Sequence, residues 1–375
     1  MIKFYCFLIA IMIVFLLMPI FIKFMLKYNV LDRSGGRKIH KGTKVNMGGI
    51  VIFLGFIASY IIAIPSLIAY EELDLVLSFA LMLCIIIVIG VRDDMNSLTP
   101  KVKLVVEIII GMFICKIGIR IDNLYGLFGV NELPTWVSYS FSIFFFIVVT
   151  NAYNLIDGVD GQSGVQALIT IIPLLLFFLF IVPDHGYKVG FGNAQFWSVI
   201  SISLIGAIIA YLYYNWYPSK VFMGDTGSIF IGLMLACIMI VAIKYNGELG
   251  SNAKIFGHEI KSKIGIVVMM FYMPLVDTLR VFVCRAMKKK SPFSPDRSHI
   301  HHFILRTGGT HQRCVFTTLI YSVLYSSIGI ILSLFLTDLY FIMFMVLAFP
   351  FFVVSLCKVV KFRMNKMKKI RLCQN

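Results

Sequence analysis

Long apolar runs, separated by short polar stretches, set the strongest limit on what this sequence can fold into. Eleven runs have the approximate limits 4–26, 48–69, 75–91, 101–119, 134–150, 164–183, 195–214, 226–243, 264–284, 314–336 and 339–357. A helix of about 20 residues crosses a hydrocarbon core of about 30 Å, and most of these runs approach that length. Unbroken runs exclude the short alternating strands of a membrane barrel. We therefore predict an all-α, polytopic membrane protein with about 11 transmembrane helices, forming a single domain over residues 1–375.

The low content of charged residues supports a membrane protein, and the distribution of Lys and Arg predicts its orientation. Charged residues make up 14% of the chain, whereas soluble domains carry about 25%. A net charge of +16 would suit a nucleic-acid partner, but membrane proteins gather Lys and Arg in their cytoplasmic loops. If the segment 27–46 is cytoplasmic, 24 of the 34 Lys and Arg fall inside and 8 outside. We expect no nucleic-acid partner, an external N-terminus, and a cytoplasmic C-terminus with a basic tail at 358–375, in the plasma (inner) membrane.

This orientation places every unusual polar cluster on the cytoplasmic side. The clusters span 37–49, 92–100, 151–164, 215–228 and 296–302. Structural turns alone would be scattered over both faces of the membrane. One-sided clustering therefore predicts a single site that is reached from the cytoplasm.

The stretch from Asn151 to Gly161 holds two carboxylates, Asp157 and Asp160, between two apolar runs. Carboxylates at a membrane boundary are costly, and they indicate a functional site. On a helix, residues three apart would share one face. The alternative is a polar turn between two helices with an N-cap. The residues themselves leave both interpretations open.

Three further aspartates stand at the ends of apolar runs. Asp93 and Asp94 end the third run, where adjacent carboxylates repel unless they are solvated or hold a cation. Asp225 opens the eighth run between Gly224 and Gly227, so it is either an N-cap or part of a site that a ligand approaches closely. Aspartates gathered on one face need a divalent cation, and their most natural ligand is a Mg²⁺-bound phosphate.

Three histidines lie within four residues, at His299, His301 and His302. One zinc ion could hardly take all three, because the neighbouring His301 and His302 are expected to point apart on a helix. Phosphate or nucleotide binding together with Arg297 is the second interpretation, and a nonspecific surface cluster is the third. Asp277 lies within an apolar run, one turn before Arg280, and we expect these two residues to form an ion pair.

Taken in order, these motifs resemble those of the polyprenyl-phosphate N-acetylhexosamine-1-phosphate transferases, glycosyltransferase family 4. This family includes the enzymes that start O-antigen, enterobacterial common antigen and teichoic acid synthesis, and the related phospho-MurNAc-pentapeptide translocase. The matching residues are Arg37-Lys38-Ile39-His40, Gly48-Gly49, Asp93-Asp94, Asn151 to Gly161, Asn215, Lys220 to Ser228, Asp277-Thr278 and Ser294 to His302. The resemblance covers about residues 30–310. Each motif alone is unspecific, but the ordered set is specific.

Details within the motifs resemble the UDP-GlcNAc branch of the family. The stretch Met95 to Leu98 lacks the lysine that the pentapeptide translocase carries after its aspartate pair. The form His-Ile-His-His at 299–302 is also similar to that branch. The loop from Thr43 to Met47 departs from the Pro-rich loop of many members, which makes Lys44 unusual. The conformation of this loop is therefore open.

The resemblance implies transfer of N-acetylhexosamine-1-phosphate from a UDP-sugar to undecaprenyl phosphate in the membrane, with release of UMP. The sugar is expected to be GlcNAc, and another UDP-N-acetyl sugar is the alternative. The lipid-diphospho-sugar would initiate a cell-surface polysaccharide, such as lipopolysaccharide O-antigen or a cell-wall polymer. A membrane transporter is the rival from another class, although its polar residues would lie near mid-membrane. A homodimer is compatible with the resemblance.

The resemblance also implies roles for individual residues. Asp93, Asp94 and Asp225 would be catalytic, and Asp93 or Asp94 would orient or deprotonate the lipid phosphate. Mg²⁺, or Mn²⁺ in its place, would be held by Asp225, Asp93 and Asp157. Substrate binding would fall to Lys44, Asn151, Asn154, Asp157, Asp160, Asn215, Lys220, Arg297, His299, His301 and His302. A double displacement, with one aspartate as covalent nucleophile, is the alternative to direct transfer.

Overall fold

The computed structural model describes residues 1–28, 31–32, 44–67, 73–183, 192–287, 289, 299–306, 308–351, 354 and 358. Its helices are α1 (Ile2–Lys27), α2 (Gly49–Leu67), α3 (Leu73–Met95), α4 (Pro100–Lys116), α5 (Thr135–Ile156), α6 (Gln162–Phe180), α7 (Ala194–Asn215), α8 (Gly224–Leu249), η1 (Gly250–Asn252), α9 (Gly265–Met270), α10 (Tyr272–Met287), α11 (Ile300–Arg306) and α12 (His311–Ser333). A further apolar helix spans Asp338–Phe351. Antiparallel two-stranded ribbons pair β1 (Leu31–Asp32) with β2 (Lys44–Val45), β3 (Asn123–Leu127) with β4 (Val130–Glu132), and β5 (Lys254–Ile255) with β6 (His258–Glu259).

Within these ranges, eight helices are long and apolar enough to cross a membrane: α1, α2, α3, α5, α6, α7, α8 and α12. They coincide with eight of the predicted runs. The run 101–119 forms α4, which has 17 residues, and the run 339–357 contains the helix Asp338–Phe351. The run 264–284 divides at Phe271 into α9 and α10. The prediction of an all-α polytopic membrane protein is confirmed, while the number of crossings and their orientation stay predictions.

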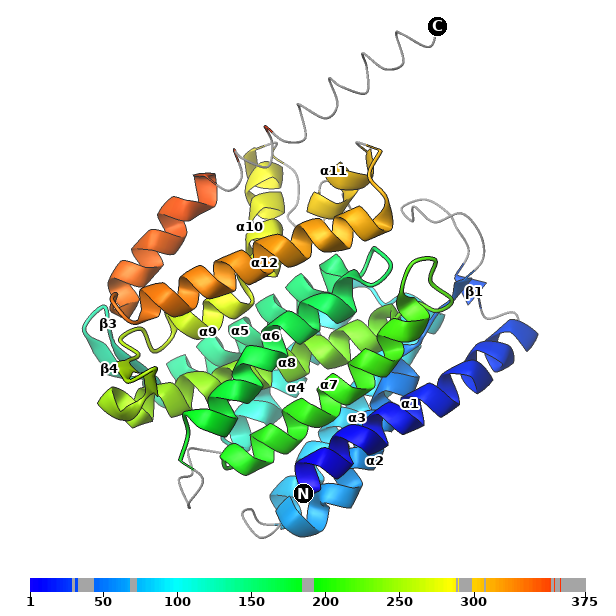
Figure 1. The fold of residues 1–375 in the computed structure, drawn as a ribbon, viewed down its shortest axis with the longest axis horizontal. Coiled ribbons are helices and arrows are strands. Elements are labelled where there is room, and N and C mark those ends of the chain that lie inside the picture. Colours follow the sequence, from blue (N-terminus) through cyan, green and yellow to red (C-terminus); the bar gives the residue numbers. More distant parts are fainter. Residues whose placement is uncertain are drawn as a thin grey trace, which may run out of the picture.

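Helix α8 forms the centre of the bundle. Figure 1 shows it running between α1–α3 on one side and α10–α12 on the other. All residues in its most apolar stretch are buried. Glycines let two other helices reach its backbone. A Cβ on Gly49 of α2 would lie 2.1 Å from the Gly227 nitrogen, and a Cβ on Gly90 of α3 would lie 2.5 Å from Thr226 Cα. Both contacts fall near the first turn of α8, so α2 and α3 fix that turn in place.

Buried apolar side chains form two clusters. The larger one surrounds α8 and includes residues from α1 to α7. The smaller one joins α9 to α12 and includes Met269, Tyr272, Ile300 and Val315. Ile156, the last residue of α5, belongs to the larger cluster, whereas Val159 in the following turn belongs to the smaller one. The turn between α5 and α6, which carries the predicted aspartates, therefore lies where the two clusters meet.

Candidate active site

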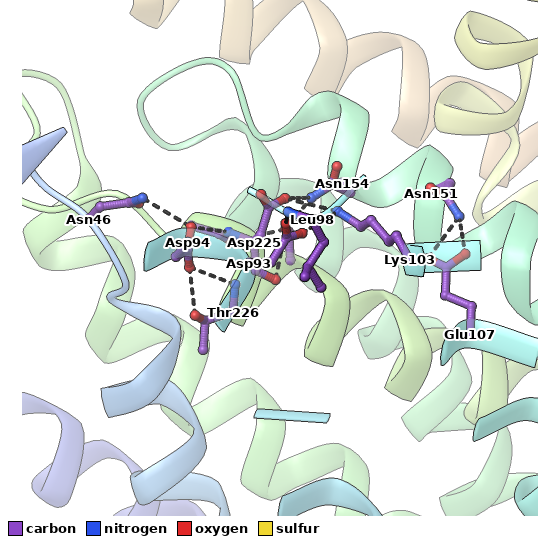
Figure 2. Close-up of polar contacts among 12 residues, drawn as sticks. Asn46, Asp93, Asp94, Leu98, Lys103, Glu107, Asn151, Asn154, Asp225 and Thr226 are labelled. Carbon is purple, nitrogen blue, oxygen red and sulfur yellow. Dashed lines mark hydrogen bonds and ion pairs between the residues drawn. The ribbon is translucent and has the colours of Figure 1, made fainter. Parts of the chain in front are cut away.

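The Asp94 carboxylate, in the last turn of α3, caps the N-terminus of α8. It accepts hydrogen bonds from the Asn46 side chain at 3.0 Å, the Asp225 N–H at 2.9 Å, and the Thr226 N–H and hydroxyl at 2.9 and 2.6 Å (Figure 2). The first N–H groups of a helix have no partner within that helix, so they need acceptors from outside. Gly224 has a φ of 75°, and a Cβ there would lie 2.6 Å from Asp94 Oδ2. The cap therefore comes from another helix, and Asp225 is not a local N-cap.

Lys103 on α4 lies between two of the predicted catalytic carboxylates (Figure 2). Its Nζ is 2.9 Å from Asp93 Oδ2 and 3.4 Å from Asp225 Oδ1. The other oxygen of Asp93 accepts the Leu98 N–H at 2.7 Å. The side chain of Asp93 is 5% exposed, whereas that of Asp225 is 36% exposed. One ammonium thus holds two carboxylates from different helices together, and Asp225 is the more accessible of the two.

Sequence reasoning missed Lys103, because it was counted only as one positive charge on the cytoplasmic side. Helix α3 ends at Met95 and α4 begins at Pro100, so the link between them is short. Thr99 starts α4 by accepting the Val102 N–H at 3.4 Å, and a proline at the first helical position favours the same start. This Thr-Pro signal, four residues after a helix end, would have predicted an antiparallel pair that brings the first turn of α4 beside the last turn of α3.

The two predicted asparagines on α5 reach different helices. Asn154 donates to Asp225 Oδ1 at 2.5 Å and to the Ser228 hydroxyl at 2.7 Å. Asn151, one turn earlier, donates to both carboxylate oxygens of Glu107 on α4 at 3.0 and 2.9 Å (Figure 2). The structure therefore places Asn154 beside the Asp225 carboxylate and Asn151 one layer deeper, where it holds α4 against α5.

Asp160 forms a buried ion pair with Lys44. The ammonium lies 3.1 and 3.0 Å from the two carboxylate oxygens, and the Ser219 N–H donates to the same carboxylate at 3.1 Å. His311 Nδ1 lies 3.5 Å from Asp160 Oδ1, and Lys44 Nζ lies 4.7 Å from the centre of the Phe222 ring. Burial alone would raise the pKa of Asp160, but hydrogen bonds from His311, Ser219 and Lys44 outweigh it and hold the pKa below its ordinary value.

Asp157 and Asp160 lie in the turn after α5, so they do not share a helical face. Asp157 accepts a hydrogen bond from the Ser163 hydroxyl at 2.6 Å, at the start of α6. Asn215 braces the turn from the end of α7, since its side-chain oxygen accepts the Gly161 N–H at 2.8 Å. Its amide donates to the carbonyl of Val221 at 2.8 Å. The predicted alternative of a polar interhelical turn is thus correct for the local structure, and its two aspartates contact different segments.

The loop after β2 joins these two groups of side chains. Lys44 binds Asp160, and Asn46, two residues further on, donates to Asp94 at 3.0 Å. Side chains from the ends of α3, α5 and α7 and from the starts of α4 and α8 therefore converge on one end of the bundle. This convergence agrees with the predicted clustering of the polar motifs at a single site.

The histidines pack against the turn between α5 and α6. The ring of His301 lies 5.7 Å from that of His299 and 4.2 Å from that of His302. The expectation that His301 and His302 point apart is therefore wrong, because rotation about the side-chain torsions brings the rings of consecutive residues together. His301 Nε2 lies 3.0 Å from where a Cβ on Gly158 would be. Burial, and then the neighbouring His302, lower the pKa of His301 to about 3, so its ring is neutral at pH 7.

Of the two remaining predicted binding residues, Lys220 and Arg297, the structure describes only Lys220. Lys220 is exposed on the loop between α7 and α8, where its N–H donates to the Tyr214 carbonyl at 2.9 Å. Arg297 lies outside the described residues.

Asp93 and Asp225, two of the three predicted metal ligands, suit a metal site that is completed by substrate. Among the described residues, no three His, Cys, Asp or Glu side chains form a group that could hold a metal by themselves. Mg²⁺ commonly uses one or two carboxylates together with substrate phosphates and waters. Asp93 and Asp225 offer oxygen donors only, which suits such a hard cation, whereas Asp157 is engaged with Ser163. Mg²⁺ stays a prediction on this chemistry.

Comparison with known proteins identifies relatives over most of the chain. The sequence profile described as glycosyl transferase family 4 matches residues 76–243. Decaprenyl-phosphate N-acetylglucosaminephosphotransferase of Mycobacterium tuberculosis (strain ATCC 25618 / H37Rv) is 31% identical over 291 residues, 74% of this chain and 70% of the relative. The probable undecaprenyl-phosphate N-acetylglucosaminyl 1-phosphate transferase of Bacillus subtilis (strain 168) is 27% identical over 330 residues, 87% and 84% of the two chains.

A third relative is the undecaprenyl-phosphate alpha-N-acetylglucosaminyl 1-phosphate transferase of Escherichia coli (strain K12). It is 26% identical over 314 residues, which are 81% of this chain and 77% of the relative. The residues that the family profile matches, 76–243, include all five predicted site aspartates, which are Asp93, Asp94, Asp157, Asp160 and Asp225. From these matches and its helical architecture, the chain is a multi-pass membrane enzyme that belongs to glycosyl transferase family 4.

Proposed function

We propose that this enzyme transfers GlcNAc-1-phosphate from UDP-GlcNAc to undecaprenyl phosphate and releases UMP. The names of the relatives support both the sugar and the polyprenyl phosphate acceptor. The observation that carries the proposal is the arrangement of Asp93, Lys103 and Asp225 beside the N-terminus of α8. Such a set of carboxylates and an ammonium suits the binding of phosphates and a divalent cation.

The chemistry exchanges one phosphoanhydride for another. An oxygen of the lipid phosphate attacks the β-phosphorus of the donor, a new P–O bond forms, and the bond from that phosphorus to the bridging oxygen breaks, so that UMP leaves. Catalysis of this kind depends on positioning and on neutralising the developing charge. Asp225 and Asp93 would hold Mg²⁺, which supplies charge neutralisation when it is bound. Lys103 places a further positive charge next to the same carboxylates.

Of the two candidates for orienting or deprotonating the lipid phosphate, we propose that Asp93 has this role and that Asp94 caps α8. Its carboxylate already accepts four hydrogen bonds at the start of α8, so proton transfer would compete with them. A phosphate monoester has its second pKa near 6 and is largely dianionic at pH 7. The lipid phosphate therefore needs orientation more than it needs deprotonation. Asp93 and Lys103 are the side chains that would provide it.

The remaining polar residues would bind the donor. The histidine segment and Arg297 would hold the diphosphate or sugar, and the turn at 157–161 with Lys44 and Asn215 would surround the nucleotide. The 24 to 8 distribution of Lys and Arg supports a site on the cytoplasmic face, where nucleotide sugars are available. The product would be the lipid-diphospho-sugar on which a cell-surface polysaccharide is built.

An assay with purified protein tests the proposal. We expect UMP release that requires undecaprenyl phosphate and Mg²⁺ and that is fastest with UDP-GlcNAc in a panel of UDP-N-acetyl sugars. Asp225→Asn should abolish release, whereas Asp122→Asn should not. Asp122 is a matched control, because it is also 36% exposed and also pairs with a lysine, Lys244 at 2.8 Å. UMP release without the lipid would refute undecaprenyl phosphate as the acceptor. Full release by Asp225→Asn would refute a catalytic role for the Asp225 carboxylate.

A further inference from the structure

A buried carboxylate on α10 holds the histidine segment in place. Asp277 is 4% exposed, and its Oδ1 accepts hydrogen bonds from Arg280 at 2.7 Å and from the Ile300 N–H at 3.1 Å. Its Oδ2 lies 3.1 Å from His299 Nδ1. The expected ion pair with Arg280 is therefore confirmed. The contacts to His299 and Ile300, more than twenty residues further along the chain, were not expected from the sequence.

Asp277 and Arg280 together clamp α11 onto α10. The Ile300 N–H is the first of α11, so Asp277 supplies that helix with a cap. The Arg280 guanidinium carbon lies 5.2 Å from the centre of the Phe303 ring, one turn further on. In Figure 1, α10 and α11 stand beside each other above α12. The position of the histidine segment is thus set by an acid and a base from one face of α10.

The hydrogen bond to Asp277 also determines which nitrogen of His299 carries the proton and which one can bind a ligand. An ionised carboxylate can only accept hydrogen bonds, so His299 must carry its proton on Nδ1. Nε2 is then the nitrogen turned away from Asp277. The His299 ring lies nearly parallel to that of His301, at 5° and 5.7 Å. His301 in turn lies against Gly158, in the turn that carries Asp157 and Asp160.

We propose that Asp277 is a positioning residue of the transferase, acting through His299. It keeps the ring in the Nδ1-protonated form, so that Nε2 can accept a hydrogen bond from a hydroxyl or the amide N–H of the donor sugar, and it keeps α11 against the turn at 157–161. This inference rests on the proposed function, since the ligand of Nε2 is the N-acetyl sugar of the donor in that reaction. Asp277 itself does not touch the reacting atoms.

Asp277→Asn tests this role while preserving the shape of the side chain. Its amide would donate to His299 Nδ1 and so favour the opposite tautomer, as when an amide replaces any carboxylate that orients a histidine. We expect kcat to fall roughly 10–100-fold, the range found for residues that orient metal-binding histidines from outside. In a double-mutant cycle, Asp277→Asn should lower kcat much less once His299→Gln is present, and only through the lost Ile300 cap.

Asp338→Asn is the matched control. Asp338 is 5% exposed and also caps a helix start, accepting the N–H groups of Lys263, Ile264 and Gly265 at 2.9 Å each. A purely structural role for Asp277 predicts that both variants lose thermal stability and that their folded fractions keep normal kcat. That outcome would overturn the proposal. If Asp277→Asn does not accumulate as folded protein, Asp277→Ser takes its place, because it also removes the carboxylate that holds the His299 proton on Nδ1, and the same loss of kcat is expected.

A spectroscopic measurement separates this inference from the proposed function. In protein labelled with ¹⁵N-histidine, the ring nitrogens of His299 should show protonation at Nδ1, and Asp277→Asn should move the proton to Nε2. If the wild-type enzyme released no UMP from any UDP-sugar, the proposed function would fail, and this spectrum would still decide the positioning. Unchanged ring nitrogen shifts in Asp277→Asn would overturn the inference whatever the activity.

Discussion

Asp94→Asn is the substitution that best separates capping of α8 from catalysis. The amide keeps the shape of the side chain but retains only one oxygen, so two of the four donors around it lose their acceptor. A hydrogen bond to a charged group contributes about 1.5–3 kcal/mol. Two such losses amount to about 3–6 kcal/mol before the structure relaxes. Asp94 is partly exposed, so water can replace some of the lost hydrogen bonds. We therefore expect the free energy of unfolding to fall by about 2–3 kcal/mol.

Thermal unfolding of the purified protein in detergent measures this loss. The unfolding entropy of about 2.1 cal/mol/K per residue amounts to about 0.8 kcal/mol/K for 375 residues, so the midpoint should fall by about 3–4 °C. Activity should fall as well, by about 100-fold, because displacement of the first turn of α8 moves Asp225, and an error of about 1 Å in an active site has an effect of that size. Folded Asp94→Asn would therefore be both less stable and less active.

Asp93→Asn provides the comparison on the neighbouring residue. Its remaining oxygen can still accept the Leu98 N–H, so it loses one contact, to Lys103. The thermal midpoint should fall by less than half as much as in Asp94→Asn, while UMP release is strongly reduced. An Asp94→Asn protein with the wild-type thermal midpoint and no activity would refute the capping argument, since the carboxylate would then act on the reactants.

Three further substitutions test other contacts of the site. Lys103→Met should lower kcat at least 100-fold, because Asp93 and Asp225 lose their shared cation; a KM effect without a kcat effect would contradict this. Lys44→Met should destabilise the protein by about 2 kcal/mol, because it leaves the fully buried Asp160 side chain without its counter-charge, and an unchanged thermal midpoint would count against it. His301 has a pKa lowered from 6.5 to about 3, so the unfolded chain takes up its proton first and stability falls as the pH drops below 6.5. His301→Gln should remove about 2 kcal/mol of that loss between pH 6.5 and 5, measured as thermal midpoints without nucleotide.

The apolar runs and the ordered polar motifs were enough to predict the fold class and most of the side chains that meet at the site. The division of the run 264–284 could also have been predicted, because Pro274 falls in the first turn of α10, where a missing N–H leaves no hydrogen bond unmade. Periodicity within one long apolar run does not show such a break. Length and hydropathy alone therefore predict one transmembrane helix over residues 264–284, where the structure has two shorter helices, α9 and α10.

The pairing of charges could not be predicted in this way. Lys44 and Asp160 are 116 residues apart, and Lys103 and Asp225 are 122 apart. Which lysine meets which carboxylate depends on how the helix ends pack. The sequence motifs carry no information on contacts between residues so far apart in the chain. In the sequence argument Lys103 was only a positive charge, and Lys44 was predicted to bind substrate rather than an aspartate of the chain. In the structure each one neutralises an aspartate of the site.

The cap on α8 has a consequence for the order in which the protein is made. Asp94 and the N–H of Asp225 that it accepts are 131 residues apart in the chain. A ribosome therefore delivers the acidic end of α3 to the membrane well before the helix that satisfies it. Until α8 is inserted, the partners already present in the growing chain are Lys103 and the Leu98 N–H for Asp93, and Asn46 for Asp94. The catalytic end of the bundle is thus completed late in biogenesis, and a nascent chain that stops before Gly224 has no assembled site.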